Sequence, residues 1–398
     1  MRRLLFAICS AVIMSQAHGQ ATPGVKLGIL EDLSGPQSEI TGQTAVEMAK
    51  LAVEDVGGQV LGGPVEIVVA DFLHKPDIAL SIARKWWDVE GVDAIVDVPN
   101  SGVALAINNL AGERKKLVLF SSASTDKMTE EECNGYAVAW TQSVSAIVNA
   151  VVSAQMKDKP KSWFIIGSDY AFGKLYEETA TKVINDRGGS VLGAVRAPLG
   201  STDFSSYLLK AKSSKADIIF VSLGGVDLVN AMKQIDEFKI ASGGQKIAMG
   251  VALDQDIHAV GLDVLQGLQS AVPFYWNLDD KSRALTARLQ KKRDTVPNGL
   301  QAGVYSVVLT YLKAIQAIGT KEPKAVFQQM QKMKIDDAFA RGAVLRANGR
   351  LAHDMFLVRI KSPKESKGTW DQLEVLSTIP AEQAFGAASD TKCPLVKQ

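Results

Sequence analysis

Histidine is scarce in this sequence, with four residues among 398. Three of them, His74, His258 and His353, lie beyond the N-terminal segment, and no two have the spacing of a zinc site. The chain also lacks a GxSxG nucleophile motif, a Walker A phosphate loop and a GxGxxG fingerprint after a strand. We therefore expect a protein that is not an enzyme and that holds no metal and no cofactor.

An excess of either charge is also missing. Lys and Arg number 44 against 43 Asp and Glu, a formal net charge of +1, which argues against a nucleic-acid or anionic-membrane partner. Beyond residue 21, no apolar run approaches the roughly 20 residues that a membrane-spanning helix needs. The length and the 46% hydrophobic content suit a globular protein with two domains.

The N-terminal segment has a different character. Arg2 and Arg3 precede an apolar run over 4–14, and the small-residue pattern Ala-His-Gly follows at 17–19. This arrangement predicts a secretory signal peptide over residues 1–21 and export of the rest of the chain. A membrane anchor is the alternative, but the apolar run is too short for one.

Cysteine is nearly absent as well. Of three cysteines, Cys133 and Cys393 lie outside the predicted signal peptide. An even pair in an exported chain favours a disulfide, and two free buried thiols are the alternative. A disulfide would bring the C-terminal tail back to the first part of the chain.

From residue 25, short β-branched runs alternate with longer amphipathic stretches, and the alternation restarts after residue 140. Because the short runs are continuously apolar, they predict parallel sheets covered by helices on both faces. We expect two doubly wound units of similar topology. The expected strands are 25–30, 64–71, 92–98 and 116–122 in the first unit, and 162–169, 190–198, 216–223 and 246–251 in the second.

The last third of the chain predicts three further helices, near 281–292, 301–318 and 322–334, then a strand over 356–363 and a polar tail. If the tail returns to the first unit, the chain passes between the units more than once. The connection is then a hinge of several segments.

Small polar residues follow several of the expected strands. They occur at 99–102, 121–124 and 168–173, and a Gly-Gly pair follows at 224–225. Carboxyl ends of parallel strands are where ligands bind in open α/β sheets, and backbone N–H groups at helix starts favour an anion. Ordinary helix caps are the alternative for any one of these ends. Four such ends over two units favour a ligand held between them.

Several segments, in this order, resemble the type I periplasmic binding proteins, and in particular the branched-chain amino-acid (leucine-binding) group that serves ABC importers. The resemblance covers essentially the whole chain beyond the predicted signal peptide. The segments are SGP (34–36), KPDIA (75–79), DYAFG (169–173), TDFSSYLLKAKSSKADIIFV (202–221), QAGVYSVVLTYLKAI (301–315) and GRLAHDMFLVRIKSP (349–363).

The resemblance implies two Rossmann-like lobes joined by a three-segment hinge, the Venus-flytrap arrangement. The implied boundaries are residues 22–141 plus 274–352 for lobe 1, residues 142–273 plus 353–379 for lobe 2, and 380–398 for a tail that returns to lobe 1.

The resemblance also implies a ligand pocket. The residues that match the family's carboxylate pocket are Asn100, Ser101, Ser122, Ala123 and Ser124. Phe172, beside Tyr170, matches an aromatic residue of the second lobe, and Gly224 stands where amino-acid binders often carry a ring.

One departure bears on the ligand. Relatives that bind α-amino acids place an acid where this chain has Ala252, and that acid takes the ammonium group. A buried ammonium without a counter-charge is strongly unfavourable. Asp254 or Asp227 would have to substitute; otherwise the ligand lacks an α-ammonium.

Three consecutive aromatic residues, Phe274, Tyr275 and Trp276, fall at the expected second crossing between the lobes, and Trp140 falls at the first. Consecutive side chains of a strand point to opposite faces, so the three rings do not share one core. With Tyr170 they would form an aromatic-walled slot for an aromatic or unsaturated carboxylate. The alternative is that these rings pack the hinge and never touch ligand.

We therefore expect a monomeric periplasmic solute-binding protein that captures a small carboxylate-bearing ligand, with an aromatic carboxylate favoured, and presents it to the permease and ATPase of an ABC importer. Branched-chain or other aliphatic amino acids are the alternative ligands. A ligand-sensing module for a membrane receptor is the alternative class of function.

Overall fold

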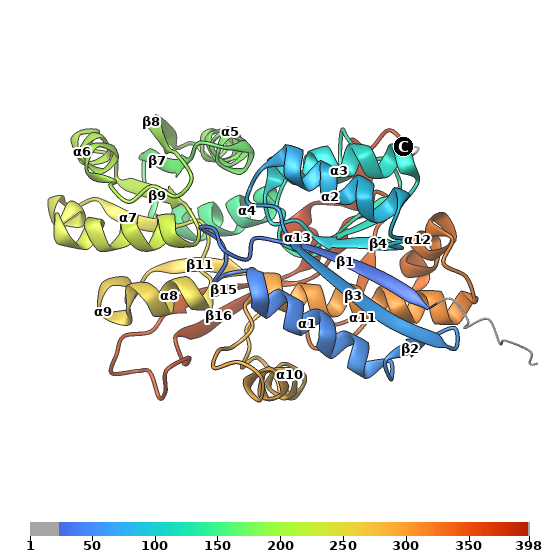
Figure 1. The fold of residues 1–398 in the computed structure, drawn as a ribbon. Coiled ribbons are helices and arrows are strands. Elements are labelled where there is room, and N and C mark those ends of the chain that lie inside the picture. Colours follow the sequence, from blue (N-terminus) through green and yellow to red (C-terminus); the bar gives the residue numbers. More distant parts are fainter. Residues whose placement is uncertain (1–23, 397–398) are drawn as a thin grey trace, which may run out of the picture.

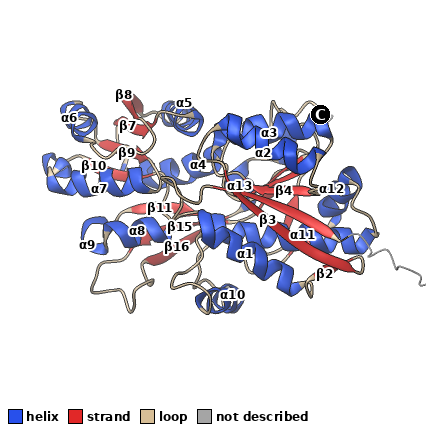
Figure 2. Ribbon diagram, in the orientation of Figure 1, coloured by secondary structure: helices blue, strands red, loops and turns tan. Residues whose placement is uncertain are grey.

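The computed structural model of the protein describes residues 24–396, so the predicted signal peptide lies outside the described residues. Figure 1 shows two groups of strands and helices side by side, and each group contains its own parallel sheet. Figure 2 shows the helices packed around both sheets. The predicted α/β fold of two doubly wound lobes is confirmed.

The first lobe is built on a six-stranded sheet in the order β2-β3-β1-β4-β5-β6. Helices α1 and α11 cover one face and α2 and α3 the other, which leaves the central strands buried along their length. The strands are β1 (Val25–Glu31), β2 (Gln59–Val60), β3 (Gly63–Asp71), β4 (Ala94–Asp97), β5 (Leu117–Phe120) and β6 (Ala137–Ala139). The helices are α1 (Gly42–Asp55), α2 (Pro76–Asp88), α3 (Ser101–Arg114), α10 (Asp280–Gln290), α11 (Gly299–Ile318) and α12 (Pro323–Lys332). A small sheet of β12 (Lys334–Ile335), β13 (Ala343–Leu345) and β14 (Leu351–Ala352) completes the lobe.

The second lobe contains a parallel sheet in the order β10-β9-β7-β8 and an antiparallel sheet in the order β11-β15-β16. Helices α4 and α5 pack on one face of the parallel sheet, and α6 and α7 on the other. The strands are β7 (Ser162–Ser168), β8 (Ser190–Ala197), β9 (Ile218–Ser222), β10 (Lys246–Met249), β11 (Gln269–Val272), β15 (Met355–Ile360) and β16 (Leu373–Ile379). The helices are α4 (Val144–Gln155), α5 (Ala171–Asp186), α6 (Ser205–Ser213), α7 (Val226–Glu237), α8 (Asp254–Val260), α9 (Leu262–Leu265) and α13 (Ala381–Phe385).

Strand β16 corrects the expectation of a polar tail after residue 363. Residues 373–379 pair antiparallel with β15. Most of the strand is exposed, with only its two ends buried, although four of its seven residues (LEVLSTI) are apolar. Sequence reasoning overlooked this short apolar segment.

The chain passes between the lobes three times. It crosses between β6 and α4, returns between β11 and α10, and crosses again between β14 and β15. Cys133 and Cys393 are joined in the structure, with their Cα atoms 5.5 Å apart. The end of the tail therefore lies against the first lobe, where Glu130 also accepts a hydrogen bond from the backbone N–H of Lys392. The start of the predicted tail, α13, packs instead with α4 of the second lobe.

Among residues 24–396, no single helix is long and apolar enough to cross a membrane, and α11 and α12, which pass the test only as a pair, are bent by 106° relative to each other.

Candidate ligand-binding site between the lobes

A small cavity of about 50 Å³ lies between the two lobes. It sits at the carboxyl ends of β4 and β5 in the first lobe and of β7, β9 and β10 in the second. From the first lobe and its first crossing segment it is lined by Gln37, Ile40, Thr41, Pro99, Ser101, Ser122, Ser124, Gln142 and Leu300. From the second lobe it is lined by Tyr170, Phe172, Leu223, Gly224, Val251 and Leu253.

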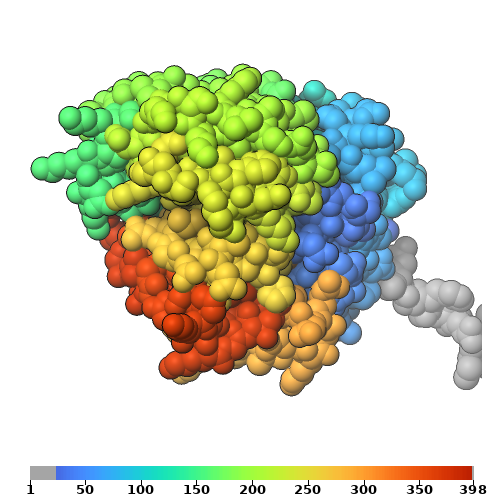
Figure 3. Space-filling view, turned by 90° about the vertical axis from the view of Figure 1, so that its left-hand side faces the viewer, coloured from blue at the N-terminus to red at the C-terminus, as the bar shows by residue number. Residues whose placement is uncertain are grey.

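Direct contacts between the lobes close this cavity. The carbonyl oxygen of Pro36 in the first lobe accepts a hydrogen bond of 3.1 Å from the N–H of Val226 in the second. The Gln37 amide donates to the Tyr170 hydroxyl at 3.2 Å. In Figure 3, the yellow-green atoms of the second lobe lie directly against the blue atoms of the first. The lobes are therefore closed on each other.

The first-lobe wall is built at the start of α3. Asn100 is the N-cap of this helix, and its side-chain oxygen accepts from the N–H groups of Gly102 and Val103. Its side-chain nitrogen lies 3.2 Å from the His74 ring. Capping thus occupies the Asn100 side chain, and Ser101, the first helical residue, lines the cavity instead.

Ser122 lies beside a buried pair of carboxyl groups. The Asp97 carboxylate accepts hydrogen bonds from the Ser122 N–H at 2.7 Å and from the Ser122 hydroxyl at 2.8 Å. Glu31 and Asp97 are both fully buried and lie beside each other on the neighbouring strands β1 and β4. Burial and the neighbouring Asp97 raise the pKa of Glu31 well above its usual range.

The second-lobe wall is aromatic. The rings of Tyr170 and Phe172 are stacked, with centroids 6.0 Å apart and planes inclined by 28°, and Phe172 packs in turn against Tyr176. Burial raises the pKa of Tyr170, so its hydroxyl keeps its proton at neutral pH. At Gly224 an added Cβ would meet only the Ile40 side chain, at 3.8 Å.

The other predicted rings pack elsewhere. Trp140 is fully buried in the first-lobe core and donates its indole N–H to Ser306 at 2.9 Å. Phe274 packs in the same core against Phe339, whereas Tyr275 packs in the second-lobe core. The three are absent from the cavity wall, which leaves Tyr170 and Phe172 as its only rings among the described residues.

The predicted partners of an ammonium group also lie off the cavity. Ala252 points into the second-lobe core, while its neighbours Val251 and Leu253 line the cavity. Asp227 accepts from the N–H of a loop residue at 2.9 Å, and burial raises its pKa to about 6. Burial likewise raises the pKa of Asp254 to about 7. No Asp or Glu of residues 24–396 is part of the cavity wall.

Of the predicted site residues, the structure brings six together around the cavity: Ser101, Ser122, Ser124, Tyr170, Phe172 and Gly224. Ala123 lies between two of them, is buried, and faces the first-lobe core.

Sequence reasoning missed the amides of Gln37 and Gln142 and the aliphatic side chains of Ile40, Leu223, Val251, Leu253 and Leu300. Two signals were available for the amides. Gln37 directly follows the Ser-Gly-Pro turn, and Gln142 lies two residues after Trp140 at the first crossing.

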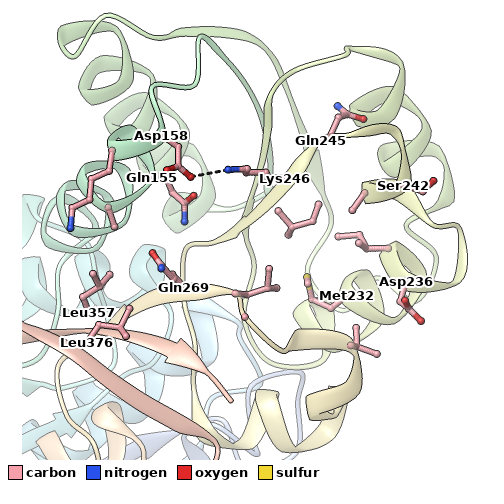
Figure 4. A pocket seen from close by; sticks show the side chains of 18 of the residues that line it. Gln155, Asp158, Met232, Asp236, Ser242, Gln245, Lys246, Gln269, Leu357 and Leu376 are labelled. Atoms are coloured by element: carbon pink, nitrogen blue, oxygen red, sulfur yellow. Dashed lines mark hydrogen bonds and ion pairs between the residues drawn. The ribbon is translucent and has the colours of Figure 1, made fainter. Parts of the chain in front are cut away.

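A larger cavity of about 670 Å³, shown in Figure 4, belongs to the second lobe alone. The view shows the Gln155 and Gln269 side chains on one side of it and Met232 on the other. It lies at the opposite end of the parallel sheet from the cleft, so movement of the lobes does not enclose it. Across the described chain, no group of three or more His, Cys, Asp or Glu residues is arranged to hold a metal ion.

Comparisons with known proteins give a consistent result. The profile of the family described as "Periplasmic binding protein" matches residues 24–369. A crystal structure of a periplasmic binding protein from Burkholderia mallei is 44% identical, with a TM-score of 0.91 over 94% of this chain and 99% of that one. A branched chain amino acid ABC transporter periplasmic ligand-binding protein from Burkholderia xenovorans is 45% identical, with a TM-score of 0.84 over 93% and 99%. A solute binding protein from R. palustris, in complex with 4-hydroxybenzoate, shares the fold at 23% identity, with a TM-score of 0.83 over 92% and 100%.

Proposed function

Because the chain belongs to the periplasmic binding protein family, we propose that it captures a small carboxylate-bearing molecule between its lobes and delivers it to an ABC importer. The protein acts in the periplasm, and its partners are the permease and ATPase of that importer. An aromatic carboxylate is the favoured ligand. The matched family is one of binding proteins, and we propose a binding function without catalysis for this chain.

The main support for this proposal is the closed cavity between the lobes, whose two walls differ in chemistry. Hydroxyl-bearing residues come from the first lobe and rings from the second. A ligand in this cavity contacts both walls only when the lobes are closed, so it binds the closed state more tightly and shifts the equilibrium towards it. The carboxylate lies near Ser101, the first residue of α3, and near Ser124, which follows β5. The dipole at the N-terminus of α3 favours an anion there.

The wall favours an aromatic acid over an α-amino acid. A flat ring fits between apolar side chains and the stacked Tyr170 and Phe172. An ammonium group in the closed cavity would find no carboxylate on the wall, and burial of an unpaired charge is strongly unfavourable. The aliphatic residues Ile40, Leu223 and Leu253 support the second candidate, a branched-chain amino acid.

Thermal-shift measurements test the proposal. The chain without its predicted signal peptide is unfolded and refolded to remove bound ligand, then heated with leucine, isoleucine, valine, and benzoate-type and cinnamate-type acids. A ligand that binds only the folded state raises the melting temperature by mass action. Stabilisation by aromatic acids alone supports the proposal. Stabilisation by leucine alone would assign the site to amino acids, and stabilisation by none of the panel would contradict both ligands.

A further inference from the structure

The hydrogen-bond donors of Ser122 are already used within the protein. Its N–H and its hydroxyl both donate hydrogen bonds to the Asp97 carboxylate, with donor–acceptor distances of 2.7 and 2.8 Å. A serine hydroxyl has one hydrogen to donate and two lone pairs that accept. Towards the cavity, which it lines, the Ser122 hydroxyl therefore presents only acceptor capacity.

Glu31 keeps Asp97 in the accepting role. One Glu31 oxygen accepts from the N–H of Gly42 at 3.2 Å, and the other has no hydrogen-bond donor among residues 24–396. The Asp97 carboxyl group is a close neighbour of Glu31. Two carboxyl groups in contact in a fully buried site do not both ionise, so a proton stays between them. Asp97 already accepts from both the N–H and the hydroxyl of Ser122, whereas one Glu31 oxygen accepts from no donor, so the proton lies on Glu31 and Asp97 remains the acceptor.

The backbone at the end of β4 supports this arrangement. Asp97 and Val98 both adopt left-handed conformations, with φ of 75° and 78°. A β-branched residue rarely adopts such a conformation, and strained backbone of this kind clusters at functional sites. The local turn directs the Asp97 side chain towards the end of β5, where Ser122 begins the next loop.

We infer that Ser122 accepts a hydrogen bond from a hydroxyl group of the ligand, which makes the ligand a hydroxy-substituted carboxylate. This inference deepens the proposed function and rests on it. The ligand carboxylate then does not bind Ser122, because it would lie only two hydrogen-bond lengths from the negative charge of Asp97 and be repelled by it. Ser124 takes the carboxylate instead, since its hydroxyl contacts the protein only at 3.5 Å.

Gln142 supplies a second acceptor on the same wall. Its side chain is 4% exposed, and its amide oxygen has no hydrogen-bond partner within the described chain. A buried polar atom without a partner is costly, whereas a ligand hydroxyl would satisfy it. The two acceptors together favour a ligand with a hydroxyl over one without.

Calorimetric titration of the refolded protein with benzoate and with 2-, 3- and 4-hydroxybenzoate tests the inference. At least one hydroxybenzoate should bind about ten-fold more tightly than benzoate, the usual effect of one good hydrogen bond. Ser122→Ala should reduce this preference to less than two-fold. Ser124→Ala, the matched serine variant, should weaken both acids by similar factors.

Two further variants separate the donor pattern from the shape of the site. In Asp97→Asn, the amide donates to the Ser122 oxygen and frees its hydroxyl hydrogen, so the preference for the hydroxybenzoate should fall as in Ser122→Ala. In Glu31→Gln, the amide donates to Asp97 in place of the carboxyl proton, so the preference should persist.

The outcomes distinguish the inference from the proposed function. Equal losses for both acids in Ser122→Ala would show that Ser122 binds the carboxylate, and would overturn the inference alone. Tighter binding of leucine than of any benzoate would overturn both. Folding of each variant is verified by its melting temperature, and the Ser122→Ala result decides the matter if Asp97→Asn does not fold.

Discussion

Closure of the lobes depends on the absence of a side chain at position 225. Gly225 has φ of 61°, and a Cβ added to it would lie 2.4 Å from the carbonyl oxygen of Pro36 in the opposite lobe. The neighbouring Val226 N–H donates to the same oxygen at 3.1 Å. Gly225→Ala should therefore hold the lobes apart and weaken ligand binding.

The size of the effect follows from the overlap. Carbon–oxygen contacts shorter than 3.0 Å are essentially never seen, so Pro36 must retreat by several tenths of an ångström and the hydrogen bond from Val226 is weakened. Overpacking of this kind typically costs about 1–3 kcal/mol. The backbone strain of an alanine at φ of 61° affects the open and the closed state alike. The overlap with Pro36 arises only in the closed state, so it alone should lower affinity by about 5- to 150-fold.

The assay is calorimetric titration with the aromatic acid that most stabilises the wild type, combined with small-angle scattering. The radius of gyration should decrease on ligand addition for the wild type but less for Gly225→Ala. Gly244→Ala is the matched control, because Gly244 also has positive φ in the second lobe and its Cβ would meet nothing within 4 Å. Unchanged affinity in Gly225→Ala, or an equal loss in the control, would refute the reasoning.

Three further predictions concern stability and the predicted rings. The folded-state pKa of Asp227 is about 6, above its usual 3.8, so the folded state binds more protons than the unfolded state and stability should fall as pH rises from about 4 to 6. Denaturant unfolding across this pH range should show a smaller fall in stability for Asp227→Asn. An identical fall in the variant would contradict the burial argument. Replacing Cys393 with Ser should lower the free energy of unfolding by about 2–5 kcal/mol, as should reducing its bond to Cys133; a melting temperature indifferent to reductant would mean that no disulfide forms. Trp140→Phe removes the hydrogen bond to Ser306 and should cost about 1–3 kcal/mol of stability with less than two-fold change in affinity, whereas a ten-fold loss would place this ring in the ligand site.

The amino-acid sequence by itself determined the architecture. Continuously apolar strands that alternate with amphipathic helices require parallel sheets covered on both faces, and two such runs require two lobes. The predicted strand order along the chain also located the ligand cleft, because the carboxyl ends of parallel strands lie at one edge of each sheet and ligands bind there. Ser101, Ser124 and Phe172 line the cavity for that reason.

Only the tertiary structure decided which side chains at those strand ends face the cavity. Residues 251–253 form a loop after β10, and no sequence pattern says which side chains of a loop will face a second lobe. Ala252 lies in the core, whereas its two neighbours line the wall. The pairing of Glu31 with Asp97, 66 positions apart, exists because β1 and β4 are adjacent in the sheet. Burial then fixes the proton between them, and with it the hydrogen-bonding role of Ser122, which no local pattern in the sequence encodes.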